Sequence, residues 1–94
     1  MISVLLKGND EEKILVLAAL GELGHDAITS KYAIEYILKS QDSHMQFLAA
    51  LTLSKVVEGY KSDLFLKVLR NSLESYNSDE ALMASSILTN LTNG

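Results

Sequence analysis

Residues 14–24 decide how the rest of the chain is interpreted, and they are Ile14-Leu15-Val16-Leu17-Ala18-Ala19-Leu20-Gly21-Glu22-Leu23-Gly24. The first seven are all apolar. A helix that is apolar all round must be buried on more than one side. The run is far shorter than the roughly 18 apolar residues that a membrane-spanning helix needs. We therefore predict an inner helix that lies between neighbouring helices, which the rest of the chain supplies.

Length and composition indicate one helical domain. The chain has 94 residues, of which 48% are apolar, and a chain of this size buries roughly 60–65% of its unfolded surface. Cysteine is absent, which excludes disulfides and thiolate metal sites. Proline is also absent and glycine occurs five times, which favours long helices joined by short connections.

The charge balance argues against nucleic acid as a partner. The chain has 12 acidic and 8 basic side chains, for a net charge of −4. Proteins that bind phosphate backbones need Lys and Arg in number, and here the basic residues are scattered. The apolar N-terminus is too short for a signal peptide and has no basic leader. We expect a cytoplasmic protein that binds no membrane.

Capping residues predict where the helices begin and end. Asn9 is suited to cap a helix over about 10–23, with Glu12 as its capping-box partner and Gly24 as its end. Asp26 is expected to cap a second helix, whose apolar or small face consists of Ser30, Ala33, Ile34, Ile37 and Leu38. Capping residues also occur at the later breaks, at Asp42, at Ser62 or Asp63, and at Asn77. The predicted elements are a short helix at 2–7 and longer helices at about 10–23, 27–40, 43–58, 63–76 and 79–92. On the last two, Leu73, Leu82 and Met83 are expected to face inward.

The apolar pattern repeats along the chain. Residues recur at lags of 32 to 35, as when Ile34, Leu38 and Leu53 recur as Leu69, Leu73 and Leu88. A period in this range, with one pair of antiparallel helices per unit, is typical of an α-solenoid. We predict a half repeat at 1–8, repeats at 9–41 and 42–77, and a capping half repeat at 78–94.

The repeated residues resemble a known family. The run from Ala18 to Gly24, preceded by Lys13 and followed by Asp26-Ala27-Ile28, resembles a HEAT-like repeat of the short, phycobiliprotein-lyase type. Asp42 to Leu53 is similar, whereas Ala81 departs from the basic residue of the pattern. The resemblance implies an all-α, HEAT-like or armadillo-like superhelix of about five or six helices. Such repeats occur in many adaptors, so it implies little about function.

No set of residues predicts catalysis or metal binding. His25 and His44 are the two histidines, and neither has the spacing of a zinc motif. The acidic clusters Asp10-Glu11-Glu12 and Asp79-Glu80 fall at predicted helix N-termini, where the helix dipole explains them. No serine has the partners of a nucleophile. We therefore expect no enzyme activity, cofactor or metal.

The predicted interaction face follows from the predicted topology. The second helices of HEAT-like units generally line the concave face, so their polar residues are expected to form adjacent ridges there. Tyr36 is the aromatic residue that we expect in the interface, because tyrosine is enriched at binding hot spots. The predicted face consists of Lys31, Glu35, Tyr36, Lys39, Lys67, Arg70, Asn71 and Glu74.

The two ends of the predicted solenoid differ. The last helix has a polar side with Ser85, Ser86, Thr89 and Asn90, as a cap requires. The first helix is apolar at Ile2, Val4, Leu5 and Leu6. We expect this end either to pack on another subunit, so that the protein self-associates there, or to have lost a partner segment.

We therefore predict a non-catalytic protein-interaction module or assembly subunit that presents a concave helical surface to a protein partner. An alternative role, which rests on the resemblance alone, is an accessory subunit of a lyase-like or chaperone-like complex. A third possibility, nucleic-acid binding by a HEAT-like glycosylase relative, conflicts with the acidic balance of the chain.

Overall fold

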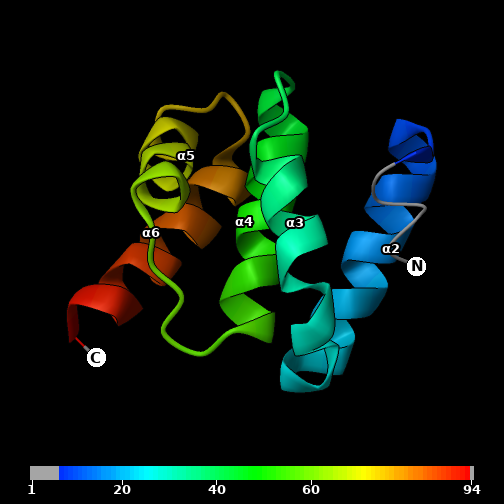
Figure 1. Cartoon of the computed structure of the whole chain (residues 1–94). Coiled ribbons are helices and arrows are strands. Elements are labelled where there is room, and N and C mark those ends of the chain that lie inside the picture. Colours follow the sequence, from blue (N-terminus) through cyan, green and yellow to red (C-terminus); the bar gives the residue numbers. More distant parts are fainter. Residues whose placement is uncertain (1–6, 94) are drawn as a thin grey trace.

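The computed structural model describes residues 7–93, with side chains as far as Leu91, and this part of the chain is helical and has no strand. The predicted self-association residues Ile2, Val4, Leu5 and Leu6 lie outside the described residues. The elements are α2 (Asp10–Leu23), the 3-10 helix η1 (Gly24–Ser30), α3 (Lys31–Leu38), α4 (Ser43–Val56), α5 (Asp63–Leu73) and α6 (Ser78–Asn93) (Figure 1).

Except for α3, the long helices begin where the capping residues predict. The side chain of each cap accepts a hydrogen bond from a backbone N–H in the first turn, which satisfies a group that has no partner inside the helix. At the end of α2, Gly24 has a φ of 60°, a conformation that favours glycine, and its N–H donates to the carbonyls of Gly21 and Leu20. The caps are Asn9 to Glu12 N at 2.8 Å, Asp42 to His44 N at 2.9 Å, Ser62 to Phe65 N at 3.1 Å and Asn77 to Asp79 N at 3.0 Å.

The predicted helix at 27–40 is wrong in its first part. Gly24–Ser30 forms a 3-10 helix, and α3 begins only at Lys31. Ala27 departs from helical geometry, with a φ of −94° and a ψ of 15°, so Asp26 caps no α-helix there. In a 3-10 helix residues three apart lie on the same side. This geometry turns both Ala27 and Ser30 into the core, where both are buried.

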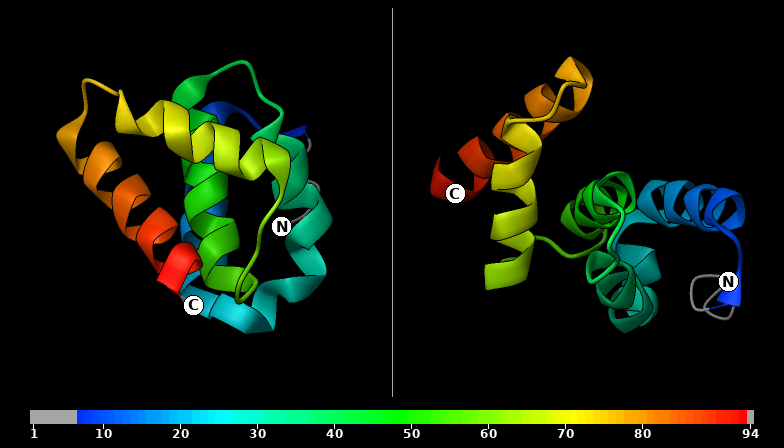
Figure 2. Two further views of the ribbon diagram at one scale, coloured as in Figure 1. Left: turned by 90° about the vertical axis from the view of Figure 1, so that its left-hand side faces the viewer. Right: turned by 90° about the horizontal axis from the view of Figure 1, so that it is seen from above.

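The central element is α4. It contacts α2 and α3 on one side and α5 and α6 on the other, and Figure 2 shows it between these two pairs. In the view from above, α2 and α4 lie next to each other, α3 lies below them in the picture, and α5 runs across the direction of α4. The helix buries side chains all round, and these are Met45, Phe47, Ala49, Ala50, Thr52, Leu53 and Val56.

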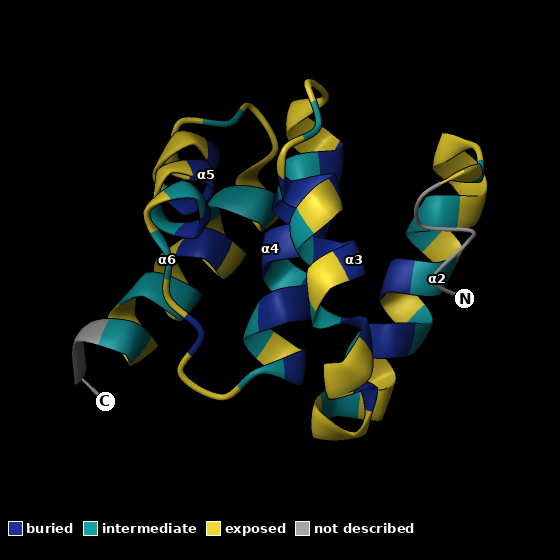
Figure 3. Cartoon of the chain, viewed as in Figure 1, coloured by how far each residue is buried: buried dark blue, intermediate teal, exposed yellow. Residues whose placement is uncertain are grey.

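The prediction that residues 14–20 form the inner helix is therefore wrong. In α2 only Leu17 and Leu20 are buried, whereas Leu15 is 67% exposed and Leu23 is 52% exposed; exposed residues recur along this helix in Figure 3. The reason is the place of each helix in the chain. Two helical elements follow α4 and pack on the side that α2 and α3 leave open, whereas the described residues supply neighbours for only one side of α2.

Three further apolar residues are not inward, as the sequence predicts, but exposed: Leu73, Leu82 and Met83. On α6 the core contacts come from Ala84 and from the partly buried Ile87, Leu88 and Leu91. These residues are spaced three or four apart and form one narrow stripe. Among the described elements α6 packs chiefly on α5 and α4, so the residues outside that stripe face away from the core.

A matched pair of truncations tests which helix is central. We expect Leu53→Ala to lower the free energy of unfolding by about 2–5 kcal/mol, because Leu53 is 0% exposed and its removal leaves a cavity. Leu15→Ala should change it by less than about 0.5 kcal/mol. Urea denaturation followed by circular dichroism measures both. An equal loss in the two variants would contradict the central position of α4.

Candidate protein-interaction surface

The outer side of α3 carries two exposed tyrosines one helical turn apart. Tyr32 is 80% exposed and Tyr36 is 56% exposed. The opposite side of α3 packs its apolar residues against the core, which directs the two tyrosine side chains outward. The buried residues are Ala33, Ile34, Ile37 and Leu38. We call Lys31, Tyr32, Glu35, Tyr36 and Lys39 the α3 face.

One end of the α3 face is held by Tyr60, from the connection between α4 and α5. Tyr60 is 8% exposed, and its hydroxyl donates a hydrogen bond of 2.5 Å to Glu35 Oε2. Its ring meets the ring of Phe65 edge-on, with centroids 5.0 Å apart. The hydroxyl joins the α4–α5 connection to α3, and the ring joins the same connection to α5. The hydrogen bond therefore fixes Glu35 to a residue that is itself held in place by its ring contact. This role of Tyr60 could not be predicted from the sequence, because no local pattern pairs Tyr60 with a residue 25 positions earlier.

Lys31 lies beside the same cluster. Its Nζ is 5.6 Å from the centroid of the Tyr32 ring and 5.7 Å from that of Tyr60. These distances fit cation–π contacts. The ammonium group therefore lies between a buried ring and an exposed one, which places the charge of Lys31 beside the exposed ring of Tyr32.

The environment of Tyr60 raises its pKa above the ordinary value of 10.0. Burial is the largest cause, because it disfavours the phenolate, and the hydrogen bond to Glu35 is the second. The folded state therefore keeps the proton of Tyr60 at pH values where the unfolded chain loses it.

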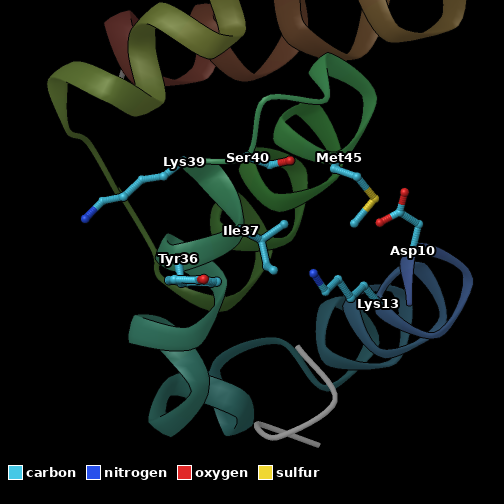
Figure 4. A pocket seen from close by; sticks show the side chains of 7 residues that line it. All are labelled: Asp10, Lys13, Tyr36, Ile37, Lys39, Ser40 and Met45. Carbon is cyan, nitrogen blue, oxygen red and sulfur yellow. The ribbon is translucent and has the colours of Figure 1, made fainter. Parts of the chain in front are cut away.

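Beside Tyr36 the surface is hollowed by a cavity of about 280 Å³ between the start of α2 and the end of α3. The buried side chains of Ile37 and Met45 form its floor. Figure 4 shows Lys13 reaching across the hollow toward Ile37, and Lys39 pointing away from it. The remaining lining residues are Asp10, Tyr36 and Ser40. The hollow is thus apolar at the bottom and charged on the α2 side.

The predicted residues on α5 are exposed but form a separate row. Lys67, Arg70, Asn71 and Glu74 are all exposed, and α5 contacts α3. Asn71 lines a different depression, at the starts of α4 and α6. Among the described residues, no hydrogen bond or ion pair joins the α5 row to the α3 face. The structure thus gathers Lys31 and Glu35 around Tyr60, and places Tyr36 and Lys39 at the hollow.

Other features of the described residues have structural explanations. His44 Nδ1 lies 2.6 Å from Glu80 Oε1 and joins the start of α4 to the start of α6. Within the described part of the chain no three His, Asp or Glu side chains converge as metal ligands.

A groove of about 520 Å³ lies on the other side of Tyr60, between the α4–α5 connection and α6.

Among the described residues, no helix has the length and apolar character required to cross a membrane.

The chain matched no protein-family model, no curated protein and no solved structure in three comparisons.

Removing the Tyr60 hydroxyl tests the anchor of the α3 face. We expect Tyr60→Phe to lower the free energy of unfolding at neutral pH by about 0.5–1.5 kcal/mol, because Glu35 loses a hydrogen bond and the ring remains. The raised pKa of Tyr60 stabilises the folded state fully below pH 10.0, and this stabilisation is lost as the pH rises above that value.

The wild-type free energy of unfolding should therefore decrease more steeply than that of Tyr60→Phe above about pH 10, as measured by urea denaturation across pH. Parallel pH profiles for the two proteins would contradict the assignment.

Proposed function

We propose that this protein is a non-catalytic protein-interaction module whose α3 face binds a partner protein. The observation that carries the proposal is the exposure of Tyr32 and Tyr36 on one side of one helix. Tyrosine presents a large, stiff surface that is apolar along its ring and polar at its tip, and it is enriched at binding hot spots. These two residues offer an anchor, and the hollow that Tyr36 borders offers a place to insert a partner side chain.

The surroundings of the tyrosines support the proposal. Glu35 is held by Tyr60, and Lys31 lies between the rings of Tyr32 and Tyr60. Side chains that already have a fixed position lose less conformational entropy when a partner binds. The α3 face is therefore suited to bind as a preformed surface.

We further propose that the helices form a HEAT-like solenoid. The neighbours support this arrangement: α2 contacts α4 and α4 contacts α6, as first helices of successive repeats would, while α3 contacts α5, as second helices would. In a solenoid each unit contacts only the next one. The α3 face and the α5 row would then lie on the side of the second helices.

Nuclear Overhauser contacts in solution test the solenoid. We expect contacts between the side chains of α3 and α5 and between those of α4 and α6. Extensive contacts between α2 and α6 would indicate a closed bundle instead, because these helices belong to the first and last units of the solenoid.

Substituting the two tyrosines tests the function. We expect Tyr32→Ser combined with Tyr36→Ser to reduce recovery of the partner by about tenfold or more, because hot-spot aromatic residues each contribute about 2 kcal/mol or more. The measurement is affinity capture from a lysate of the cells in which the protein occurs, with a photo-crosslinking residue at position 39 and quantitative mass spectrometry.

Tyr76→Ser is the matched control, because Tyr76 is also exposed but lies between α5 and α6, away from the α3 face. It should leave recovery unchanged. All of these side chains are exposed, so the free energy of unfolding should change little in either variant. A partner retained by the double variant, or lost equally in Tyr76→Ser, would overturn the proposal.

A further inference from the structure

We propose that the outer side of α2 is a second docking surface, and that its occupant is an amphipathic helix of a partner protein with basic residues beside an apolar stripe. This inference goes beyond the proposed function, because it concerns another helix and another partner segment. The juxtaposition behind it is a set of exposed leucines and unpaired carboxylates on one side of a helix that the described residues leave uncovered. We call its exposed residues the α2 face, and they are Glu11, Glu12, Leu15, Ala18, Glu22 and Leu23.

The spacing of these residues places them on one surface. Positions three, four and seven residues apart share a side of an α-helix. The α2 face follows this spacing from Glu11 through Leu15 and Ala18 to Glu22. The buried residues of α2 point to the opposite side, toward the core. In Figure 1, α2 forms one edge of the molecule, so a partner can approach it from outside.

The centre of the α2 face is apolar and suited to accept a helix. Leu15 is 67% exposed and Leu23 is 52% exposed. Between them lie two consecutive alanines, Ala18 and Ala19. Small side chains between larger ones permit a second helix to approach closely, and the two consecutive alanines of α4 are fully buried between its neighbours in this way. The same arrangement on α2 has no neighbour among the described helices.

A depression of about 190 Å³ adjoins the α2 face, between α2 and α4. Ala18 and Glu22 border it on the α2 side, and the buried residues Leu17 and Thr52 contribute to its lining. The depression accommodates one aliphatic side chain. A partner helix that lies along α2 can therefore insert a residue there, as helices that pack together do.

The carboxylates of the α2 face determine the sign of its occupant. The helix contains four of the twelve acidic residues of the chain and one of its eight basic ones. That basic residue, Lys13, reaches across the hollow toward Ile37 and is not part of the α2 face. The single ion pair among the described residues lies elsewhere, between the starts of α4 and α6. The three carboxylates of the α2 face are therefore free to pair with a partner.

Glu22 is the carboxylate that the fold itself does not explain. The helix dipole favours Glu11 and Glu12 in the first turn of α2, but Glu22 lies in the last turn, where the dipole disfavours a negative charge. Lys55 of α4 lies against Gly21 at the edge of the α2 face. It forms no ion pair with Glu22. A basic residue of a partner would supply the opposite charge that Glu22 lacks.

The same carboxylates disfavour other occupants. They repel the phosphates of nucleic acid and of anionic lipids. A second copy of the chain that packed α2 on α2 would place carboxylates against carboxylates. A helix with an apolar stripe and basic flanks matches both the centre and the edges of the α2 face, and amphipathic helices commonly bind apolar surfaces in this way.

Selection from a library of helical peptides tests the inference. Peptides as long as α2, which has 14 residues, are selected on the immobilised full chain and on Glu11→Lys combined with Glu22→Lys. Because the dipole of α2 disfavours the first change and favours the second, we expect this double variant to fold. We expect basic peptides with aliphatic residues at helical spacing to be enriched on the wild type, but not on the double variant.

The matched control is Glu58→Lys combined with Glu74→Lys. These residues are also exposed but follow α4 and α5, and the control changes the net charge by the same amount. The affinity of an enriched peptide, measured by fluorescence anisotropy, should fall by about tenfold or more in the α2 double variant and remain near that of the wild type in the control. It should also fall as the salt concentration rises.

Leu15→Ser tests the apolar centre without changing the charge, and it should also weaken the peptide by about tenfold. Enrichment of neutral or acidic peptides would overturn the inference, as would the absence of enrichment or an equal loss of affinity in the control.

Two other occupants of the α2 face would also overturn the inference. A second copy would appear as a dimer in sedimentation that Leu15→Ser dissociates. Coverage by residues 2–6 would appear as nuclear Overhauser contacts between these residues and Leu15 or Leu23. The Tyr32 and Tyr36 variants should bind the enriched peptide as the wild type does, so the proposed function is decided separately.

Discussion

The central position of α4, whose buried residues point in several directions, is the constraint on which the other elements depend. Ala49 and Ala50 have no exposed surface, and neither do Leu53 and Val56, so neighbouring helices must pack closely on both sides of α4. Small side chains at two consecutive positions permit this close approach, while the larger residues fill the space between the helices. Thr52 adds a polar link, because its hydroxyl donates to the carbonyls of Leu48 and Leu17 and so joins α4 to α2. Burial of a polar hydroxyl is tolerated there because it is hydrogen-bonded.

Because α4 lies at the centre, the helices around it form most of the surface. Because α2, α3, α5 and α6 each pack on α4 or on one another along one side, each retains an outer side. On α2 that side is partly apolar, with Leu15 and Leu23 exposed, and on α6 it is mostly Ser, Thr and Asn. On α3 it carries the tyrosines. The outer sides thus differ in chemistry although they arise from the same packing, and this difference distinguishes the α3 face from the remaining surface.

Tyr60 connects the core to the surface. Its ring contacts Phe65, which is fully buried, and its hydroxyl binds Glu35 on the outer side of α3. A connection of six residues between α4 and α5 is thereby fixed at its centre rather than only at its ends. The rigidity that we invoke for binding by the α3 face comes from this contact.

Much of the local structure could be predicted from the sequence. The caps at Asn9, Asp42, Ser62 and Asn77 and the end of α2 at Gly24 depend on groups within three or four residues of each other, so local chemistry suffices to place them. The buried side of α3 was also predicted, because residues spaced three and four apart must share a helix face.

What only the tertiary structure decided depends on neighbours far along the chain. Residues 14–20 are as apolar as an inner helix requires, yet α4 is the central one, because burial depends on how many elements pack around a helix and not on its own composition. The 3-10 geometry of η1, the exposure of Leu73, Leu82 and Met83, and the pairing of Tyr60 with Glu35 have the same origin.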